Sequence, residues 1–293
     1  MRNLVSIKLG NRCNLSCEYC CQKDMYKKDM YKKNMYVYKP EILIPKVVDT
    51  IKNKFNNDSY IYFVGGETLL YMDIIKDVVE RMKEFSWWNS KYILYTNGYY
   101  LTDELVDYFN ENNFEIYVSW DGTASKITRG YNIFDDKDKL NVMKRIENLY
   151  ITTLITNESL LLDKFDILNS FNKEYLKYNF YSLNVIFRII RGYYYKPEVI
   201  KRFKEEINTI IDTRYTSILE SKFLNGECKP SHRNILSYII DGKKICAPSQ
   251  EDFDRYQAYI FCKKCPVTNY CISHTFSENK AIYCYLCRIL YTI

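Results

Sequence analysis

The chain has 293 residues, of which 47% are hydrophobic and 27% are charged, and its formal net charge is +6 at pH 7. These proportions are globular, so they exclude disordered and collagen-like classes, and the length suits one large α/β domain with a smaller one attached. No apolar run reaches the roughly 18 residues that a membrane-spanning helix needs, and the N-terminus lacks the apolar region of a signal peptide. We therefore expect a cytoplasmic protein with no membrane partner.

Short apolar runs alternate with longer amphipathic runs along the first two thirds of the chain, which is the pattern of repeated βα units. Because parallel strands need long crossovers, six such units predict an α/β fold with a parallel sheet covered by helices. The expected strands span residues 4–9, 60–64, 92–96, 114–119, 151–155 and 183–190, and the expected helices span residues 41–55, 69–85, 102–112, 137–149, 159–172 and 197–213.

Glycines follow the first four expected strands. In parallel α/β folds ligands bind at the carboxyl ends of the strands, where glycine allows the backbone to approach a ligand closely. Each glycine could equally serve only to turn a strand into a helix, but four consecutive units of this kind favour a binding site. The glycines are Gly10, Gly65, Gly66, Gly98 and Gly122.

Two segments depart from the βα pattern. Residues 23–37 are three copies of a five-residue repeat that fits neither a helix nor a strand, so we expect an exposed loop, either a lid or partner contact or a drifted low-complexity repeat. Near residue 225 the composition changes: from residue 228 onward there are nine Lys and Arg against five Asp and Glu, with many cysteines. We expect one domain over residues 1–222 and a Cys-rich domain over residues 223–293.

Eleven cysteines in a reducing compartment indicate metal ligation rather than disulfides. Cys13, Cys17 and Cys20 form a C-x3-C-x2-C pattern directly after the first expected strand. Three thiolates on one loop can hold three irons of a 4Fe-4S cluster and leave the fourth iron open to an external ligand. A structural zinc site normally has four protein ligands and fits less well. Adjacent residues point apart, so Cys21 is interpreted as an ordinary small apolar residue.

The cysteine trio, with Tyr19 at the aromatic position, resembles the C-x3-C-x-aromatic-C signature of the radical S-adenosylmethionine (radical SAM) superfamily. The resemblance extends over residues 4 to about 190 and implies a partial (β/α)6 TIM-like barrel. The motifs that follow in the family's order are Gly65-Gly66-Glu67, similar to GGE; Tyr95-Thr96-Asn97-Gly98, similar to TNG; and Ser119-Trp120-Asp121-Gly122 with Arg129, similar to S-x-D-G followed by an arginine. Some of these residues have another interpretation: Glu67 could merely begin a helix, Asp121 with Gly122 is a common turn, and Arg129 could be a solvated surface residue.

The resemblance implies a role for each motif in binding SAM beside a 4Fe-4S cluster held by the cysteine trio. Glu67 would accept a hydrogen bond from the methionine amino group, and Arg129 would bind the methionine carboxylate through two N–H groups. Asn97 and Ser119 would lie near the ribose. Asp121 belongs to the same S-x-D-G segment, and Tyr19, Gly65 and Gly66 complete the residues expected to bind this cofactor.

The cysteines of the tail resemble the SPASM/twitch extension, which holds auxiliary 4Fe-4S clusters. Thr275 stands where that family has a further cysteine, and Gly242 lies four rather than five residues before the second tail cysteine. These departures leave one or two auxiliary clusters as the expectation, with His274 as another candidate ligand and a zinc ribbon as the alternative. The expected ligands are Cys228, Cys246, Cys262, Cys265, Cys271, Cys284 and Cys287.

The resemblance implies reductive cleavage of SAM to a 5′-deoxyadenosyl radical, which abstracts hydrogen from a peptide substrate, as in maturation of a ribosomally made peptide by crosslinking, thioether formation, epimerisation or oxidation. Since the signature already starts at Cys13, leader recognition would need a separate partner, the five-residue repeat or the tail. We also expect a reductase such as flavodoxin or ferredoxin as a partner. An anaerobic sulfatase-maturase-like role is an alternative, although Ala247 stands where that family has aspartate. An iron–sulfur electron carrier or a metal-stabilised nucleic-acid binder is another, and we do not favour nucleic acid as a partner.

Overall fold

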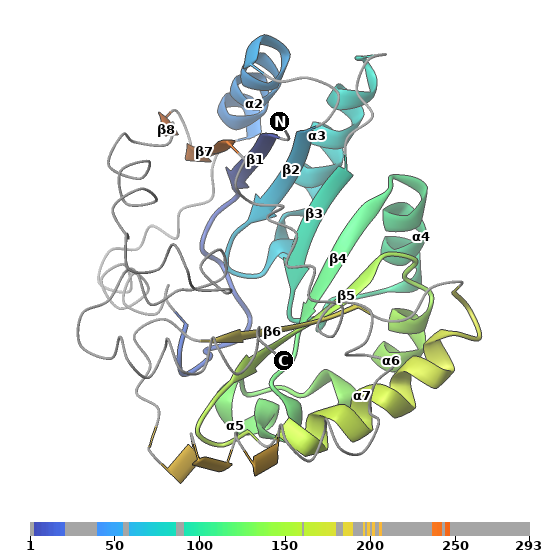
Figure 1. Cartoon of the computed structure of the whole chain (residues 1–293). Coiled ribbons are helices and arrows are strands. Elements are labelled where there is room, and N and C mark those ends of the chain that lie inside the picture. Colours follow the sequence, from blue (N-terminus) through green and yellow to red (C-terminus); the bar gives the residue numbers. More distant parts are fainter. Residues whose placement is uncertain are drawn as a thin grey trace, which may run out of the picture. The chain divides into compact units, whose positions relative to one another are not determined.

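In the computed structural model the chain folds into parallel strands with helices between them (Figure 1). The structure describes residues 3–20, 40–54, 59–85, 91–159, 161–179, 184–189, 196, 198–199, 201–202, 205–206, 236–241 and 244–246. The strands are β1 (Asn3–Lys8), β2 (Ser59–Val64), β3 (Lys91–Thr96), β4 (Phe114–Ser119), β5 (Leu149–Ile155), β6 (Asn184–Ile189), β7 (Leu236–Asp241) and β8 (Lys244–Cys246). The helices are α2 (Pro40–Lys54), α3 (Met72–Lys83), α4 (Asp103–Glu111), α5 (Ser125–Thr128), α6 (Lys137–Lys144) and α7 (Leu161–Tyr175), with short 3-10 turns η1 (Thr68–Tyr71), η2 (Gly122–Ala124) and η3 (Ile133–Asp135).

The strand order is β6-β5-β4-β3-β2-β1-β7-β8. Six strands in sequence order confirm the predicted α/β fold with a parallel sheet. The pairing of β7 with β1 was not predicted: β7 runs parallel to β1, and β8 returns antiparallel to β7. Both strands lie within residues 223–293, which the change in composition near residue 225 predicts to be a Cys-rich domain.

The described residues divide into two compact units. The first draws on residues 1–118, 133–149 and 234–253, and the second on residues 119–132 and 150–233. The expected boundary near residue 222 lies outside the described residues, as do the repeat at 23–37 and all tail cysteines except the backbone of Cys246. In the described part of the chain no helix is long and apolar enough to cross a membrane.

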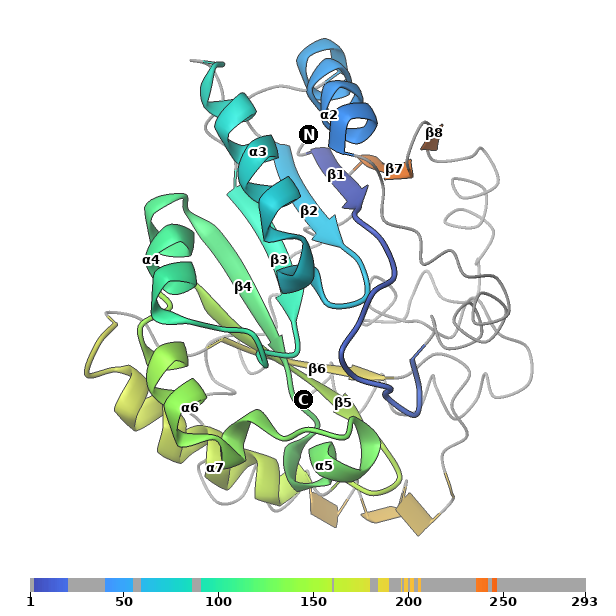
Figure 2. The ribbon, with the colours of Figure 1, turned by 180° about the vertical axis from the view of Figure 1, so that it is seen from behind.

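One face of the sheet in the first unit forms its core. The register aligns Val5, Ile61, Tyr92 and Phe114 across β1 to β4, and the next buried row is Ile7, Phe63, Leu94 and Ile116. The core-facing side chains occupy every second position of each strand, because successive side chains point to opposite faces of the sheet. The ring centroid of Phe109 in α4 lies 5.1 Å from that of Phe114 in β4. Figure 2 shows α3 and α4 on the same side of the sheet. Apolar burial of this kind is the main source of folding free energy.

Three tyrosines form a row on the opposite face of the same strands. Tyr62 of β2 lies 5.2 Å from Tyr95 of β3, and Tyr95 lies 4.5 Å from Tyr117 of β4, measured between ring centroids. All three are only partly buried. Cross-strand aromatic pairs of this type stabilise the sheet.

Three helices differ from the sequence-based expectation. The run expected over residues 69–85 begins as the 3-10 turn η1, because the Glu67 side chain accepts a hydrogen bond from Leu69 N and caps that turn. The helix expected to reach residue 149 ends at Lys144, since β5 already begins at Leu149. The helix expected from Ser159 begins at Leu161, because Ser159 exchanges hydrogen bonds with Thr156 in the preceding loop.

Candidate functional site

The cysteine trio lies on the loop that leaves β1. Cys13, Cys17 and Cys20 are half-buried, and none of them forms a disulfide. Cys20 N donates to Cys17 O at 3.2 Å, which closes a tight turn between the last two, and Leu15 N donates to Cys13 Sγ at 3.4 Å. Burial raises the pKa of Cys13 to about 11, although the bond from Leu15 opposes that shift. Cys13 is therefore a neutral thiol at pH 7, and a metal must displace its proton to bind it.

The donor set of this loop fits an iron–sulfur cluster. Cys17 and Cys20 both act electrostatically on Cys13, so the three sulfurs share one region of one unit. Within the described ranges no three His, Cys, Asp or Glu side chains already lie at the separations that hold a metal ion. Three thiols on one loop still match a cluster that leaves one iron open.

Glu67 joins the end of β2 to the end of β3. Its carboxylate is 1% exposed, and its Oε1 accepts hydrogen bonds from Thr96 Oγ1 at 2.6 Å and from Leu69 N at 3.1 Å. Its Oε2 accepts from Asn97 N at 2.8 Å. Three donors around one buried carboxylate make strong, charge-assisted bonds. Glu67 therefore fixes the backbone of two successive expected SAM motifs, the GGE and TNG segments.

Asn97 connects the TNG segment to the cysteine loop. Its Nδ2 donates to Asn14 Oδ1 at 2.8 Å, and its Oδ1 accepts from Tyr99 N at 2.9 Å. Asn14 directly follows Cys13, so this bond holds the cysteine loop against the end of β3. Gly98 follows with φ +81°, a conformation that strongly favours glycine.

The backbone of the cysteine loop is also tied to the GGE segment. Gly66 N donates to Gly10 O at 3.2 Å, and Glu67 N donates to Arg12 O at 2.8 Å. Arg12 N in turn donates to the hydroxyl of the buried Tyr71 at 2.6 Å. A Cβ atom on Gly65 would lie 3.1 Å from Gly10 O, so the two segments approach closely where glycine allows it. The first unit thus brings together the cysteine loop, Gly65, Gly66, Glu67 and Asn97.

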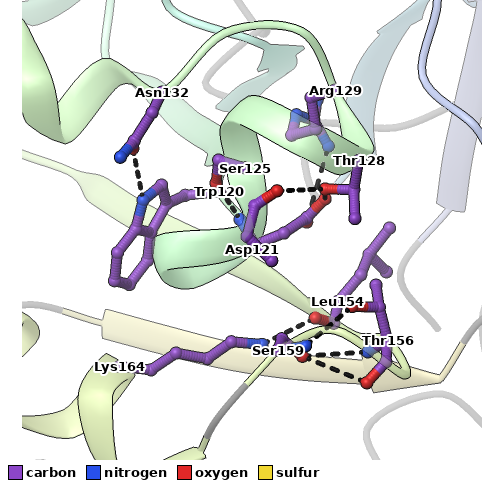
Figure 3. A network of polar contacts seen from close by, with 11 residues as sticks. Trp120, Asp121, Ser125, Thr128, Arg129, Asn132, Leu154, Thr156, Ser159 and Lys164 are labelled. Carbon is purple, nitrogen blue, oxygen red and sulfur yellow. Dashed lines mark hydrogen bonds and ion pairs between the residues drawn. The ribbon is translucent and has the colours of Figure 1, made fainter.

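The second unit carries the S-W-D-G segment (Figure 3). Trp120 is fully buried, its backbone N donates to Thr152 O at 2.8 Å, and its Nε1 donates to Asn132 Oδ1 at 2.8 Å. Asp121 N donates to Ser125 Oγ at 2.8 Å, so the turn after β4 is held at both its ends. Ser119 is the last residue of β4 and is half-buried.

Asp121 and Arg129 form a buried ion pair in this unit. Arg129 Nη1 lies 3.6 Å from Asp121 Oδ1, and Thr128 Oγ1 donates to Asp121 Oδ2 at 2.9 Å. Arg129 is 9% exposed and Asp121 is 0% exposed. A guanidinium with five N–H groups can hold one carboxylate of the protein and still orient further N–H groups toward another anion.

Three residues, Asn14, Tyr71 and Lys164, have roles in these segments that no motif predicts. Asn14 and Tyr71, together with Thr96 of the TNG segment, hold the motif segments of the first unit, and Lys164 lies buried near Asp121 in the second. Of the three unpredicted residues, only Lys164 has a usable sequence signal. It falls at a helical spacing with Leu168, Phe171 and Tyr175, all of which are buried, so it occupies the apolar face of α7.

A family model and curated relatives match much of this chain. The family model described as the Radical SAM superfamily matches residues 7–165, more than half of the chain. The Radical SAM cyclopropyl synthase TigE of Paramaledivibacter caminithermalis is 25% identical over 261 residues, covering 83% of this chain and 53% of TigE. A serine-type anaerobic sulfatase-maturating enzyme of Bacteroides thetaiotaomicron is 29% identical over 184 residues, covering 59% of this chain and 42% of that enzyme. The chain thus spans about half of the length of these relatives.

Solved structures share the fold. The structure of anSMEcpe with bound AdoMet and the Cp18Cys peptide has a TM-score of 0.55 at 20% identity, over 75% of this chain and 62% of that one. The structure of SuiB from Streptococcus suis has a TM-score of 0.53 at 12% identity, over 98% of this chain and 71% of that one. At these identities the likeness concerns the fold alone.

Proposed function

We propose, from the premise that this chain belongs to the radical SAM superfamily, that it uses SAM to start radical chemistry on a peptide or protein substrate. Of the relatives with similar sequences, TigE is named a radical SAM cyclopropyl synthase, and the Bacteroides enzyme is named for the maturation of a protein, a sulfatase. The solved structures with the same fold include one that holds AdoMet and a peptide. The fold class we assign to residues 1–222 in this proposal is a partial (β/α)6 barrel.

The observation that carries the proposal is the buried carboxylate of Glu67, which accepts hydrogen bonds from both Thr96 and Asn97. The GGE and TNG segments are therefore one rigid structure, to which Asn14 adds the cysteine loop. A rigid arrangement of binding groups is what a cofactor site needs, because the groups need not be ordered on binding.

In this proposal Cys13, Cys17 and Cys20 hold a 4Fe-4S cluster with one open iron. When bound, the cluster supplies one electron that splits SAM into methionine and a 5′-deoxyadenosyl radical, which takes a hydrogen atom from the substrate to give 5′-deoxyadenosine and a substrate radical. The chain's own residues bind and orient SAM. Arg129, held by Asp121, offers N–H groups to the methionine carboxylate.

Other chain residues complete the SAM site in the proposal. Asn97 and Ser119 lie near the ribose, and the Gly65-Gly66-Glu67 segment accepts from the methionine amino group. Tyr19, half-buried beside the last cysteine of the trio, covers the cluster and limits the access of water.

The remaining parts of the chain receive supporting roles in the proposal. Residues 223–293 form a SPASM-like domain with one or two auxiliary 4Fe-4S clusters, held by the tail cysteines from Cys228 to Cys287. A flavodoxin or ferredoxin supplies the electron. A separate protein presents the leader of the peptide substrate.

The proposal is tested by 5′-deoxyadenosine release from the anaerobically reconstituted protein with SAM and dithionite. We expect Cys17→Ala to abolish 5′-deoxyadenosine release. Cys21→Ala should retain it, because Cys21 adjoins the trio without being a ligand. A protein with a full iron load that forms no 5′-deoxyadenosine, and whose cluster shows no SAM-dependent change in its electron paramagnetic resonance signal, would contradict the proposal and favour an electron carrier.

A second candidate is the oxidation of a serine or cysteine side chain in another protein, as the names of two sulfatase-maturating relatives suggest. The sequence departs from the sulfatase-maturating group at Ala247, where that group has aspartate. Incubation with a serine-containing sulfatase peptide distinguishes the candidates. Loss of two hydrogens from the serine side chain, seen by mass spectrometry, supports this second function, and an unchanged peptide beside ongoing 5′-deoxyadenosine release excludes it.

A further inference from the structure

A lysine lies buried beside the turn that follows β4. Lys164, in the first turn of α7, is 0% exposed, and its Nζ donates to the backbone carbonyl of Leu154 near the end of β5 at 2.7 Å. Figure 3 shows its side chain extending from α7 to that carbonyl, below the turn that carries Asp121. The lysine therefore closes the connection from β5 to α7 within the second unit.

The alkyl chain of Lys164 packs directly against the turn. Gly122 has φ +79°, and a Cβ atom built on it would lie 2.7 Å from Lys164 Cγ and 2.8 Å from Lys164 Cε. Real Cβ contacts are never this short, so the turn and the lysine chain fit together only because residue 122 is glycine. The position of the lysine chain thus limits where the backbone of the turn can lie.

The charge of Lys164 acts on the same turn. Its charged neighbours are Asp121, in the turn itself, and Glu206; each of them pairs with an arginine, Asp121 with Arg129 at 3.6 Å and Glu206 with Arg202 at 3.5 Å. Burial lowers the pKa of Lys164 to about 8, while the two carboxylates oppose that shift. At neutral pH the ammonium therefore places a positive charge beside Asp121.

Local stability alone would not select a lysine at this place. A cation in the first turn of a helix opposes the helix dipole, and a charge on a buried apolar face loses its hydration. A methionine of similar length would fill the same space without either penalty. Residues that break such rules tend to lie at functional sites.

We propose that Lys164 is a positioning residue for the S-W-D-G turn: it holds Asp121 and Gly122, and through Asp121 it holds Arg129, in the arrangement that binds the methionine carboxylate of SAM. The inference deepens the proposed function and rests on it for the identity of the ligand. In this proposal Lys164 acts through Leu154 O, the Gly122 backbone and the charge of Asp121, rather than by touching SAM or substrate.

The test compares two substitutions of Lys164 with one of a matched lysine. Lys164→Met removes both the charge and the donor, and Lys164→Gln removes the charge but keeps an N–H donor. Lys173→Met changes an exposed lysine on the same helix. The first readout is hydrogen exchange of residues 119–132 in protein without SAM, and the second is the SAM dissociation constant of the reconstituted, unreduced holoenzyme by equilibrium dialysis, with KM and kcat for 5′-deoxyadenosine release.

We expect both Lys164 variants to exchange faster over residues 119–132 and to bind SAM about tenfold more weakly, with KM raised more than kcat is lowered. Lys173→Met should leave the exchange rates, the SAM dissociation constant, KM and kcat within about twofold of the wild-type values. Unchanged exchange and unchanged SAM affinity in a folded Lys164 variant overturn the inference. Failure of both Lys164 variants to fold also overturns it, because the lysine would then be needed for folding rather than for the site.

The outcome is separable from that of the proposed function. If the wild-type holoenzyme binds no SAM and releases no 5′-deoxyadenosine, the proposed function fails. The exchange measurement needs no ligand, so it still reports whether Lys164 holds the turn.

Discussion

The carboxylate of Glu67 accepts a hydrogen bond from the backbone N–H of Asn97 at 2.8 Å, although 30 residues separate the two in the chain. Through this bond the end of β2 holds the end of β3. Glu67 then also accepts from Thr96 and Leu69, so a single buried side chain organises two motif segments. Its substitution should therefore affect the folded state as well as any ligand.

Glu67→Gln should destabilise the protein by about 2 to 3 kcal/mol. The amide offers one acceptor oxygen in place of two, so at least one of three buried donors meets an N–H group and loses its partner. Urea unfolding measures the loss. Glu111→Gln, at an exposed end of α4, should change stability by less than about 0.5 kcal/mol. Equal effects of the two substitutions would show that the carboxylate of Glu67 does not organise these segments.

Asn14 and Asn97 should be energetically coupled. Asn97 Nδ2 donates to Asn14 Oδ1, so each alanine substitution removes the same bond and the two effects should not add. We expect a coupling free energy of about 1 kcal/mol from a double-mutant cycle of Asn14→Ala and Asn97→Ala, read from urea unfolding of the apoprotein. Additive effects would mean that this bond does not hold the cysteine loop to the end of β3.

The strand ends were predictable and the contacts between them were not. Each motif stands at a change from an apolar run to a glycine, a local pattern that the sequence displays. Whether the Glu67 side chain turns toward residue 97 or toward a ligand depends on how close β2 and β3 bring their ends, which no local pattern contains. The pairing of β7 with β1 was not predicted for the same reason: Asn3 and Leu236 are neighbours in the sheet, although they are 233 positions apart in the chain.

Lys164 shows the opposite case, in which the sequence carried a signal. With Leu168, Phe171 and Tyr175 it lies on one face of α7, and these three are buried. A single lysine in an apolar helix face is ordinarily read as a side chain that reaches water with its charge. The burial of its ammonium depends on the turn after β4 and on Glu206, which come from elsewhere in the chain.

Tyr71→Phe should loosen the cysteine loop. The tyrosine hydroxyl accepts from Arg12 N at 2.6 Å, one residue before Cys13, and phenylalanine leaves that N–H without its partner. We expect a loss of about 1 kcal/mol in the apoprotein and faster loss of iron from the reconstituted protein to a chelator, followed by absorbance. Tyr178→Phe, which alters a tyrosine that is 64% exposed, serves as the control and should match the wild type. Identical rates of iron loss in Tyr71→Phe and wild type would contradict this role of Tyr71.

Gly122→Ala should cost more than Gly130→Ala. Both glycines have positive φ, +79° and +82°, so the backbone strain of an added Cβ is the same at both. Nothing lies within 4 Å of a Cβ at Gly130, whereas at Gly122 that atom would meet Lys164 Cγ at 2.7 Å. We expect Gly122→Ala to be less stable than Gly130→Ala by about 1 to 3 kcal/mol, as overpacked sites are. The additional substitution Lys164→Ala should recover part of this difference, and no recovery would place the strain elsewhere.

The stability of the wild type relative to Lys164→Met should rise with pH above 8. The pKa of Lys164 is lowered to about 8 in the folded protein from its ordinary value of 10.5, mainly because the ammonium is buried. Between these two values the unfolded chain keeps the proton that the folded protein has released, so the unfolded state binds more protons and the free energy of unfolding increases with pH.

Urea unfolding of both proteins at pH 7, 8, 9 and 10 measures this difference. Its slope should reach at most about 1.4 kcal/mol per pH unit between pH 8 and 10.5 and vanish below pH 8, where both states of the wild type carry the charge. Other groups that titrate in this range, such as Cys13, whose pKa burial raises to about 11, are common to both proteins and cancel. Lys173→Met should show no such slope. A difference between wild type and Lys164→Met that stays constant across this range would mean that the ammonium of Lys164 is not desolvated, and it would remove the electrostatic part of its action on Asp121.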